Sequence, residues 1–164
     1  MKGIKFLILF YFIFNPLFSE EFIGKAQVID GDTIKIGKEK IRLFGIDAPE
    51  KKQKCKKIYL SFLIFNFQKD YNCGQISKKA LQEKIKKKEI KCISSTKDRY
   101  KRHIAICFLK SLDLNKWLVR NGYAIAYRKY SKKYVFDEIE ARENKLGLWR
   151  GSFTKPEKWR RISN

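Results

Sequence analysis

Residues 22–50 read FIGKAQVIDGDTIKIGKEKIRLFGIDAPE, and this stretch decides the fold. Its segments FIGKAQVI, DTIKI and KIRLFGI are short, rich in β-branched residues, and separated by Asp30-Gly31 and Gly37-Lys38. Short runs of this composition between turn residues are typical of neighbouring strands. We therefore expect a β meander over residues 22–46.

Later segments supply the rest of a single domain over residues 20–150. Residues 76–88 carry apolar side chains at nearly helical spacing among lysines, which predicts an amphipathic helix. EIKCIS and HIAICFL predict two more strands, LNKWLVRNG predicts a short helix closed by Gly122, and another helix is expected from near Ser131 to Gly147. Five strands with these helices predict a β+α fold, a closed, mostly antiparallel five-stranded barrel with about three helices.

The two ends of the chain differ from this domain. Residues 1–19 contain Lys2 and Lys5 followed by an apolar run from Phe6 to Phe14, too short to span a bilayer and typical of a secretory signal. Ser19 suits a cleavage site but Leu17 is not small, so an uncleaved N-terminus that associates with the membrane stays open. We expect an exported protein, either secreted or in the cell envelope or periplasm. Residues 151–164 form a basic tail that is expected to fray.

The chain is strongly basic, with 38 Lys and Arg against 17 Asp and Glu and a formal net charge of +21. A balance of this kind favours a polyanionic partner: nucleic acid, an anionic membrane surface or an acidic polysaccharide. A merely soluble cationic surface is the alternative. No feature of the sequence implies an obligate protein partner.

Two further features concern the apolar run and the cysteines. Residues 56–68, KKIYLSFLIFNFQ, are expected to be an inserted core helix or strand, with a surface-seeking or partner-binding loop as the alternative.

Cys55, Cys73, Cys92 and Cys107 allow up to two disulfides in an exported chain. We favour a Cys92–Cys107 pair, because both lie in apolar alternating segments joined by a short polar connection. Free buried thiols are the alternative.

Acidic residues gather in the meander despite the net positive charge. Asp32 follows Asp30 by two positions, and Asp47 and Glu50 lie where the third strand ends. If the meander brings these loops together, the carboxylates repel unless a positive group lies between them, and a hard divalent ion such as Ca²⁺ is a natural occupant. Arg42 alternates with Ile41 and Leu43, so it faces away from the core and offers a planar fork to a phosphate. A hairpin turn at Asp30-Gly31 and a capping role for Asp47 are the alternatives.

The motifs DGDT, then RLFGIDAPE, then DRYKR resemble, in order and spacing, those of the thermonuclease (staphylococcal-nuclease-like) family over residues 22–150. The resemblance implies an OB-fold barrel with helices and a Ca²⁺-dependent phosphodiesterase that acts on DNA and RNA, with single-stranded or frayed regions favoured.

The resemblance also implies roles for individual residues. Asp32, Asp47 and the backbone carbonyl of Ala48 match the Ca²⁺ ligands, and Asp30 matches a supporting acid. Arg42 and Arg102 match the arginines that grip the scissile phosphate, and Glu50 matches the glutamate usually assigned as general base. Tyr100 resembles a tyrosine that lies around the nucleotide in the family, and Tyr127 or Tyr130 resembles another.

Three positions depart from this pattern or stand outside it. Lys101 occupies a turn position where the family commonly has glycine, so a positive φ there would cost ~1 kcal/mol and misdirect Arg102. The run 56–68 replaces a shorter, more polar connection. His103 faces opposite to Arg102 by strand alternation and is interpreted as structural.

Three hypotheses follow. An exported Ca²⁺-dependent nuclease explains the acids, the arginines and the charge together. A catalytically silent OB-fold module that binds nucleic acid is the alternative from another class. A cationic envelope protein explains the charge and the run 56–68 but leaves the acid and arginine motifs without a role.

Overall fold

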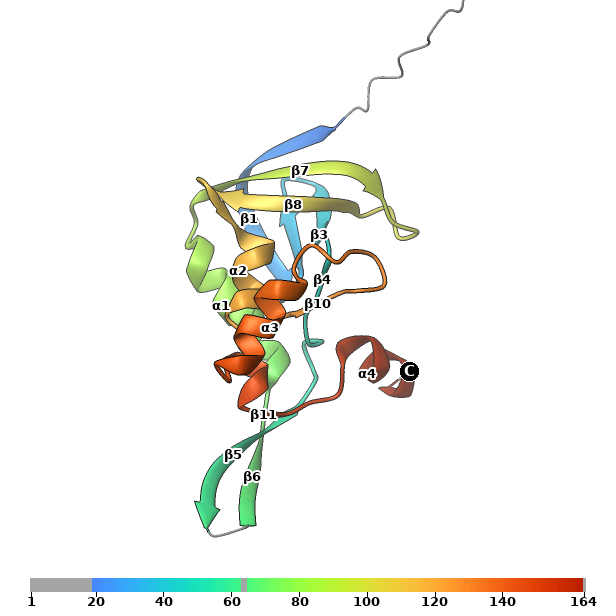
Figure 1. Cartoon of the computed structure of the whole chain (residues 1–164). Helices are drawn as coiled ribbons and strands as arrows, with labels where there is room; N and C mark the ends of the chain where they lie inside the picture. Colours follow the sequence, from blue (N-terminus) through green and yellow to red (C-terminus); the bar gives the residue numbers. More distant parts are fainter. Residues whose placement is uncertain (1–18, 63–64, 164) are drawn as a thin grey trace, which may run out of the picture.

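Five strands form the barrel in this computed structural model, which describes residues 19–62 and 65–163 (Figure 1). They are β1 (Glu20–Asp30), β2 (Thr33–Ile36), β3 (Glu39–Leu43), β7 (Glu89–Lys97) and β8 (His103–Leu109). The sheet runs in the order β3-β2-β1-β7-β8, and a further pairing of β3 with β8 closes the ring. The predicted meander, the two later strands and the five-stranded barrel are therefore confirmed. The closing β3–β8 pair is parallel, with Arg42 opposite Ile104, whereas the other barrel pairs are antiparallel.

Alternation along the strands fills the barrel. In β3, Ile41 and Leu43 are buried while Arg42 between them is only half-buried, as the pattern predicted. On β8, His103 and Ala105 are buried and face the same interior. Arg42 therefore lies on the outer surface of the barrel.

Four α-helices accompany the barrel in the described residues: α1 (Cys73–Ile85), α2 (Leu114–Arg120), α3 (Val135–Glu143) and α4 (Pro156–Ser163). The first is the helix expected at 76–88, but it starts three residues earlier and ends where Lys86 adopts a left-handed conformation. Asp113 caps α2 by accepting a hydrogen bond from the backbone N–H of Lys116. None of the described helices is both long and apolar enough to cross a membrane.

The fourth helix corrects the expectation that the tail frays. After a 3₁₀ turn (Gly147–Arg150), the short strand β11 (Gly151–Ser152) pairs with β5, and the chain then forms α4. Pro156 at the first helical position and arginines in the last turn are both favourable for a helix. Figure 1 shows α4 apart from the other three helices, at the end of an extended segment.

The apolar run 56–68 also differs from its expectation. It forms most of a hairpin, β5 (Cys55–Phe62) and β6 (Phe65–Tyr71), that projects away from the barrel (Figure 1). The expectation of a strand holds, but its place in the core is wrong: Ile58, Tyr59, Leu60 and Phe67 are between 43% and 60% exposed.

All four cysteines form disulfides. Cys92 and Cys107 lie directly opposite each other on β7 and β8 and are bonded, which confirms the predicted pair. Cys55 and Cys73 form the second bond and tie the start of β5 to the start of α1. The alternative of free thiols is therefore wrong. The segment 1–19 expected to be a signal lies, except for Ser19, outside the described residues.

Candidate active site

Two buried aspartates from separate loops meet at one end of the barrel. Asp32 lies in the turn between β1 and β2, and Asp47 lies in the short strand β4 (Ile46–Asp47), which pairs with β10 (Ile125–Ala126). The backbone N–H of Ala48 donates to Asp32 Oδ2 at 2.8 Å, and the N–H of Leu43 donates to the Asp32 carbonyl at 2.8 Å. The structure therefore brings the DGDT and IDAPE motifs together, as the sequence predicted.

Arg42 lies between the two carboxylates. Its guanidinium donates to Asp32 Oδ1 through Nη1 and to Asp47 Oδ1 through Nη2, the latter at 3.0 Å. Burial works to lower the pKa of Arg42, but the charges of Asp32 and Asp47 outweigh it and raise the pKa above its usual value. The positive group expected between the carboxylates is thus supplied in part by this arginine.

Asp30 lies on the edge of the same cluster. Its Oδ1 accepts a hydrogen bond from the backbone N–H of Gly31 at 2.8 Å. Burial raises the pKa of Asp30 to about 6, and the negative charges of Asp32 and Glu50 contribute to the increase. Asp30 is therefore a neighbour of Asp32 and Glu50, and its carboxyl group adds to the negative field around them.

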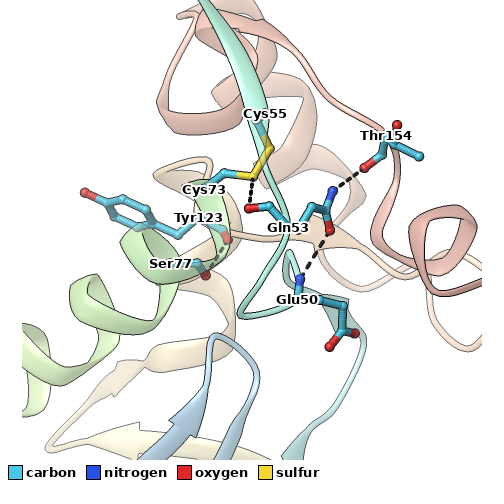
Figure 2. Close-up of a disulfide and its surroundings, with 7 residues drawn as sticks. All are labelled: Glu50, Gln53, Cys55, Cys73, Ser77, Tyr123 and Thr154. Carbon is cyan, nitrogen blue, oxygen red and sulfur yellow. Dashed lines mark hydrogen bonds between the residues drawn. A yellow bond between two sulfur atoms is a disulfide. The ribbon is translucent and has the colours of Figure 1, made fainter. Parts of the chain in front are cut away.

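Glu50 is held by its backbone in a tight turn that Figure 2 shows. The N–H of Gln53 donates to the Glu50 carbonyl at 2.7 Å, and the fully buried Gln53 side chain accepts from the Glu50 N–H at 3.2 Å. Gln53 Nε2 also donates to the carbonyl of Thr154 at 2.7 Å. A Cβ at Gly74 would lie 1.8 Å from the Glu50 carbonyl oxygen, so only glycine permits α1 to begin this close to the turn.

Gln53 was not predicted, and the Cys55–Cys73 pair was only allowed by the number of cysteines, although both fix the turn that carries Glu50. The long connection from Gln53 to Thr154 joins residues 101 positions apart. A single glutamine in a lysine-rich segment carries no sequence signal for such a contact. Its role follows from complete burial, which requires its amide groups to find partners.

Arg160 is a second guanidinium on the acidic cluster and was also missed. From α4, its Nη1 and Nη2 donate to Asp47 Oδ1 and Oδ2 at 3.0 and 3.2 Å, and Nη1 donates to Glu50 Oε1 at 2.7 Å. These hydrogen bonds and charges outweigh burial and raise the pKa of Arg160. Burial is also the largest influence on Asp47 and raises the pKa of that carboxyl.

Arg102 makes a different ion pair. Its Nε and Nη2 donate to Asp98 Oδ2 at 2.7 and 2.6 Å, so its described partner is Asp98 rather than Asp32 or Asp47. Lys101 has a φ of +62°, which confirms that this turn needs the left-handed conformation. The guanidinium lies on the same face of the β3–β8 pair as Arg42, because Ile104, two residues on, is directly opposite Arg42.

His103 is structural, as alternation predicted. It is 1% exposed, its Nε2 lies 3.1 Å from Glu39 Oε2, and its ring packs edge-on against Phe22 at 4.3 Å between centroids. Glu39 therefore has a partner inside the fold and stays outside the acidic cluster.

The three candidate tyrosines fall into two groups. Tyr100 is 64% exposed and lies beneath the guanidinium groups of Arg99 and Arg102. Tyr127 and Tyr130 pack edge to face at 4.8 Å, and the N–H of Tyr127 donates to the Gly45 carbonyl, just before β4. Burial raises the pKa of Tyr127, and the charges of Asp47 and Glu157 add to the increase. Tyr127 therefore lies close enough to Asp47 for the carboxylate charge to act on its hydroxyl, and Tyr130 packs against Tyr127.

The donor set suits a hard cation. Asp32, Asp47 and the Ala48 carbonyl offer only oxygen ligands, which Ca²⁺ and Mg²⁺ prefer. Both carboxylates are buried and already bind cationic groups, so the cluster is built to hold positive charge. Within residues 19–62 and 65–163, no three His, Cys, Asp or Glu side chains converge on one point, so a metal here would take much of its coordination from backbone oxygen, water or substrate.

Fold and site together define an OB-fold barrel with an acidic, arginine-bridged site at one end. Comparison with known proteins identifies the lineage: residues 40–151 match the profile described as staphylococcal nuclease homologue. The chain belongs to this family, and the resemblance seen in its motifs is confirmed.

Individual relatives support the same family. The chain is 35% identical over 135 residues to a Rhizobium meliloti protein named succinoglycan biosynthesis protein ExoI. This match covers 80% of this chain and 66% of the relative. It is 33% identical over 146 residues to an uncharacterized endonuclease of Haemophilus influenzae, covering 83% of this chain and 71% of the relative. A probable staphylococcal-like nuclease of Oryza sativa is 30% identical, over 79% of this chain and 31% of the plant protein.

Proposed function

We propose that this protein is an exported, calcium-dependent nuclease that hydrolyses phosphodiester bonds in DNA and RNA with little sequence selectivity. The observation that carries the proposal is the cluster of Asp32, Asp47 and Arg42 with Glu50 beside it, in a chain of the staphylococcal nuclease family. Relatives named endonuclease or nuclease in bacteria and a plant support the same class of reaction.

The residues of the cluster have distinct parts in this proposal. Asp32, Asp47 and the carbonyl of Ala48 would hold the cation, and Asp30 would strengthen the negative field around them. When bound, Ca²⁺ would neutralise charge on the phosphate and hold a water near the phosphorus. Glu50 is the general base that takes the proton of the attacking water, a contribution of about 10²–10⁴-fold in rate.

Arginines would complete the site. Arg42 donates to phosphate oxygens from the position where it now bridges the aspartates, and Arg102 approaches from the turn before β8 on the same face. Loss of a donor of this kind typically costs ~3–4 kcal/mol of transition-state stabilisation. Asp98 orients Arg102, because it accepts from both the side chain and the backbone N–H of that residue.

Substrate binding would use charge and aromatic faces. A net charge of +21 provides affinity for the phosphate backbone without regard to sequence. Tyr100, Tyr127 and Tyr130 would stack on bases, which favours single-stranded or frayed nucleic acid. The two disulfides agree with an oxidising compartment and so with export.

A cleavage assay tests this function. The purified protein is incubated with single-stranded DNA and with RNA, in Ca²⁺, in Mg²⁺ or in excess chelator. We expect cleavage of both polymers in Ca²⁺ and loss of cleavage in chelator, with recovery when Ca²⁺ is restored. Cleavage that persists in chelator would contradict the metal mechanism, and binding without cleavage in Ca²⁺ would favour a silent nucleic-acid-binding module instead.

A further inference from the structure

We propose that Arg160 is an internal competitor of the divalent cation: α4 places its guanidinium on Asp47 and Glu50, and metal binding displaces it. This inference rests on the proposed function, because it concerns the same acidic cluster. It adds a residue of the site that the sequence motifs do not contain, and it gives the C-terminal helix a role.

The contacts of Arg160 are those that a cation would need. Both oxygens of Asp47 accept from this guanidinium, at 3.0 and 3.2 Å, and Glu50 Oε1 accepts from it at 2.7 Å. Asp47 Oδ1 also accepts from Arg42. Two arginines therefore bind Asp47: Oδ1 accepts from both, and Oδ2 accepts from Arg160. A divalent ion at Asp47 would have to displace one of them, because like charges at this distance in a buried site repel strongly.

Of the two guanidinium groups, that of Arg160 is the one free to leave. Arg42 lies on the barrel strand β3, its side chain is 16% exposed, and it also binds Asp32. The Arg160 side chain is 31% exposed and lies on a helix outside the barrel (Figure 1). Displacement of Arg160 therefore leaves the barrel unchanged, whereas displacement of Arg42 would break a barrel contact.

The helix that carries Arg160 has few other contacts with the rest of the protein. Pro156 is its one buried residue within the described chain, Trp159 is partly buried, and Ile162 is 67% exposed. The salt bridges of Glu157 with Lys129 and Arg161 join partly or largely exposed side chains, and exposed pairs of this kind contribute little. An eight-residue helix is unstable in isolation. The hydrogen bonds of Arg160 to the acidic cluster are therefore the principal polar attachment of α4.

The chain just before α4 is anchored separately. Gln53 Nε2 donates to the Thr154 carbonyl, and Gly151 and Ser152 pair with β5. Figure 2 shows Gln53 between Glu50 and Thr154, next to the Cys55–Cys73 disulfide. Loss of the Arg160 contacts would therefore release residues 157–163 while the segment up to Thr154 stays in place.

Release of Arg160 would have two consequences at the cluster. It frees the Asp47 oxygens for the cation, and it frees Glu50 from the ion pair that now occupies its carboxylate. Release of Arg160 would thus make both the metal ligand Asp47 and the proposed base Glu50 available at the same time. Metal affinity and the docking of α4 are then reciprocally linked, as two binding equilibria at shared groups must be.

Calorimetric titration with Ca²⁺ alone, without nucleic acid, tests the competition. We compare the full protein with Arg160→Gln and with Arg161→Gln, which removes the same charge from the next position of α4 but leaves the acidic cluster untouched. Arg160→Gln should bind Ca²⁺ about 5- to 150-fold more tightly, the usual range for linked sites. Arg161→Gln should bind Ca²⁺ as the unmodified protein does. Two results would overturn the proposal: Arg160→Gln binds Ca²⁺ no more tightly than the unmodified protein, or neither of these two proteins binds Ca²⁺.

Limited trypsin digestion of the unmodified protein provides a measurement that needs no variant. Cleavage after Lys158 and Arg160, followed by mass spectrometry, should become faster when Ca²⁺ is added, while cleavage elsewhere stays unchanged. Unchanged or slower cleavage in α4 would show that the helix stays docked in the presence of Ca²⁺. Because neither measurement uses nucleic acid, Ca²⁺ binding that is unchanged in Arg160→Gln would overturn this proposal and leave the proposed nuclease activity intact.

Discussion

At the residue scale, the position of each side chain along its strand decides the site. Arg42 reaches Asp32 and Asp47 because alternation turns it outward between the buried Ile41 and Leu43. These acids lie ten and five positions away in sequence, yet both accept from one guanidinium. The pattern of a strand is thus enough to predict this contact once the meander is recognised.

Glu50 gives the residue-scale prediction. Glu50→Gln should lower the turnover number by about 10²–10⁴-fold, because the amide cannot accept the proton of the attacking water. Binding of single-stranded DNA should change far less, since the arginines and lysines remain. The turnover number and the dissociation constant are measured on the same preparations, with the exposed Glu143→Gln as the matched control. Equal losses of turnover and binding would contradict the role of base.

At the element scale, three of the proposed site residues lie in turns rather than in helices or strands. Asp32, Glu50 and Arg102 all lie in connections that the barrel strands or a buried contact hold in place. The turn before β8 is notable because Lys101 adopts a φ of +62°, yet Arg102 is still oriented by Asp98. The expected strain is present, while Arg102 keeps a defined ion pair.

Lys101 gives the element-scale prediction. Lys101→Gly should raise the free energy of unfolding by ~1 kcal/mol, since glycine adopts a positive φ without the steric cost of a Cβ. Lys101→Ala removes the same charge but keeps the Cβ, so it should give no comparable gain. Urea denaturation monitors both variants. We expect little change in nuclease activity, and a large rise in the glycine variant alone would show that the strained turn misdirects Arg102.

At the scale of the whole molecule, positive charge surrounds a small acidic centre. The net charge of +21 acts over the whole surface, whereas the buried carboxylates are neutralised locally by Arg42 and Arg160. In the proposed function, separate parts of the protein would hold the polyanion and the cation. Long-range attraction would bring the nucleic acid to the barrel, and the cluster would act only at close range.

Salt dependence provides the whole-molecule prediction. Binding of a single-stranded oligonucleotide to Glu50→Gln in chelator should weaken linearly on a log–log plot against salt concentration. If ~6 phosphates are neutralised, the affinity falls roughly 10²–10³-fold between 50 and 200 mM salt. An analogue of the same base sequence with an uncharged backbone should bind weakly, with little salt dependence. A flat salt dependence for the natural strand would contradict charge-driven binding.

Much of this architecture was accessible from local pattern. Turn residues and β-branched runs predicted the barrel strands, and opposed apolar segments predicted the Cys92–Cys107 bond. The hairpin at 55–71 was misplaced because an apolar run usually indicates burial, whereas here it extends from the barrel with its described apolar side chains largely exposed. The tail was misread because its helix also depends on a contact with a distant loop, which the local sequence does not reveal.

The sequence by itself determined the barrel, the family and the acids and arginines of its motifs, because period, turn chemistry and motif spacing are local properties of the chain. Only the tertiary structure decided which groups occupy the acidic cluster: Arg160 comes from 110 residues beyond Glu50 and meets it through a single ion pair. Such a contact depends on how the tail runs past Gln53 and β5, and that path is set by packing between segments far apart in the chain.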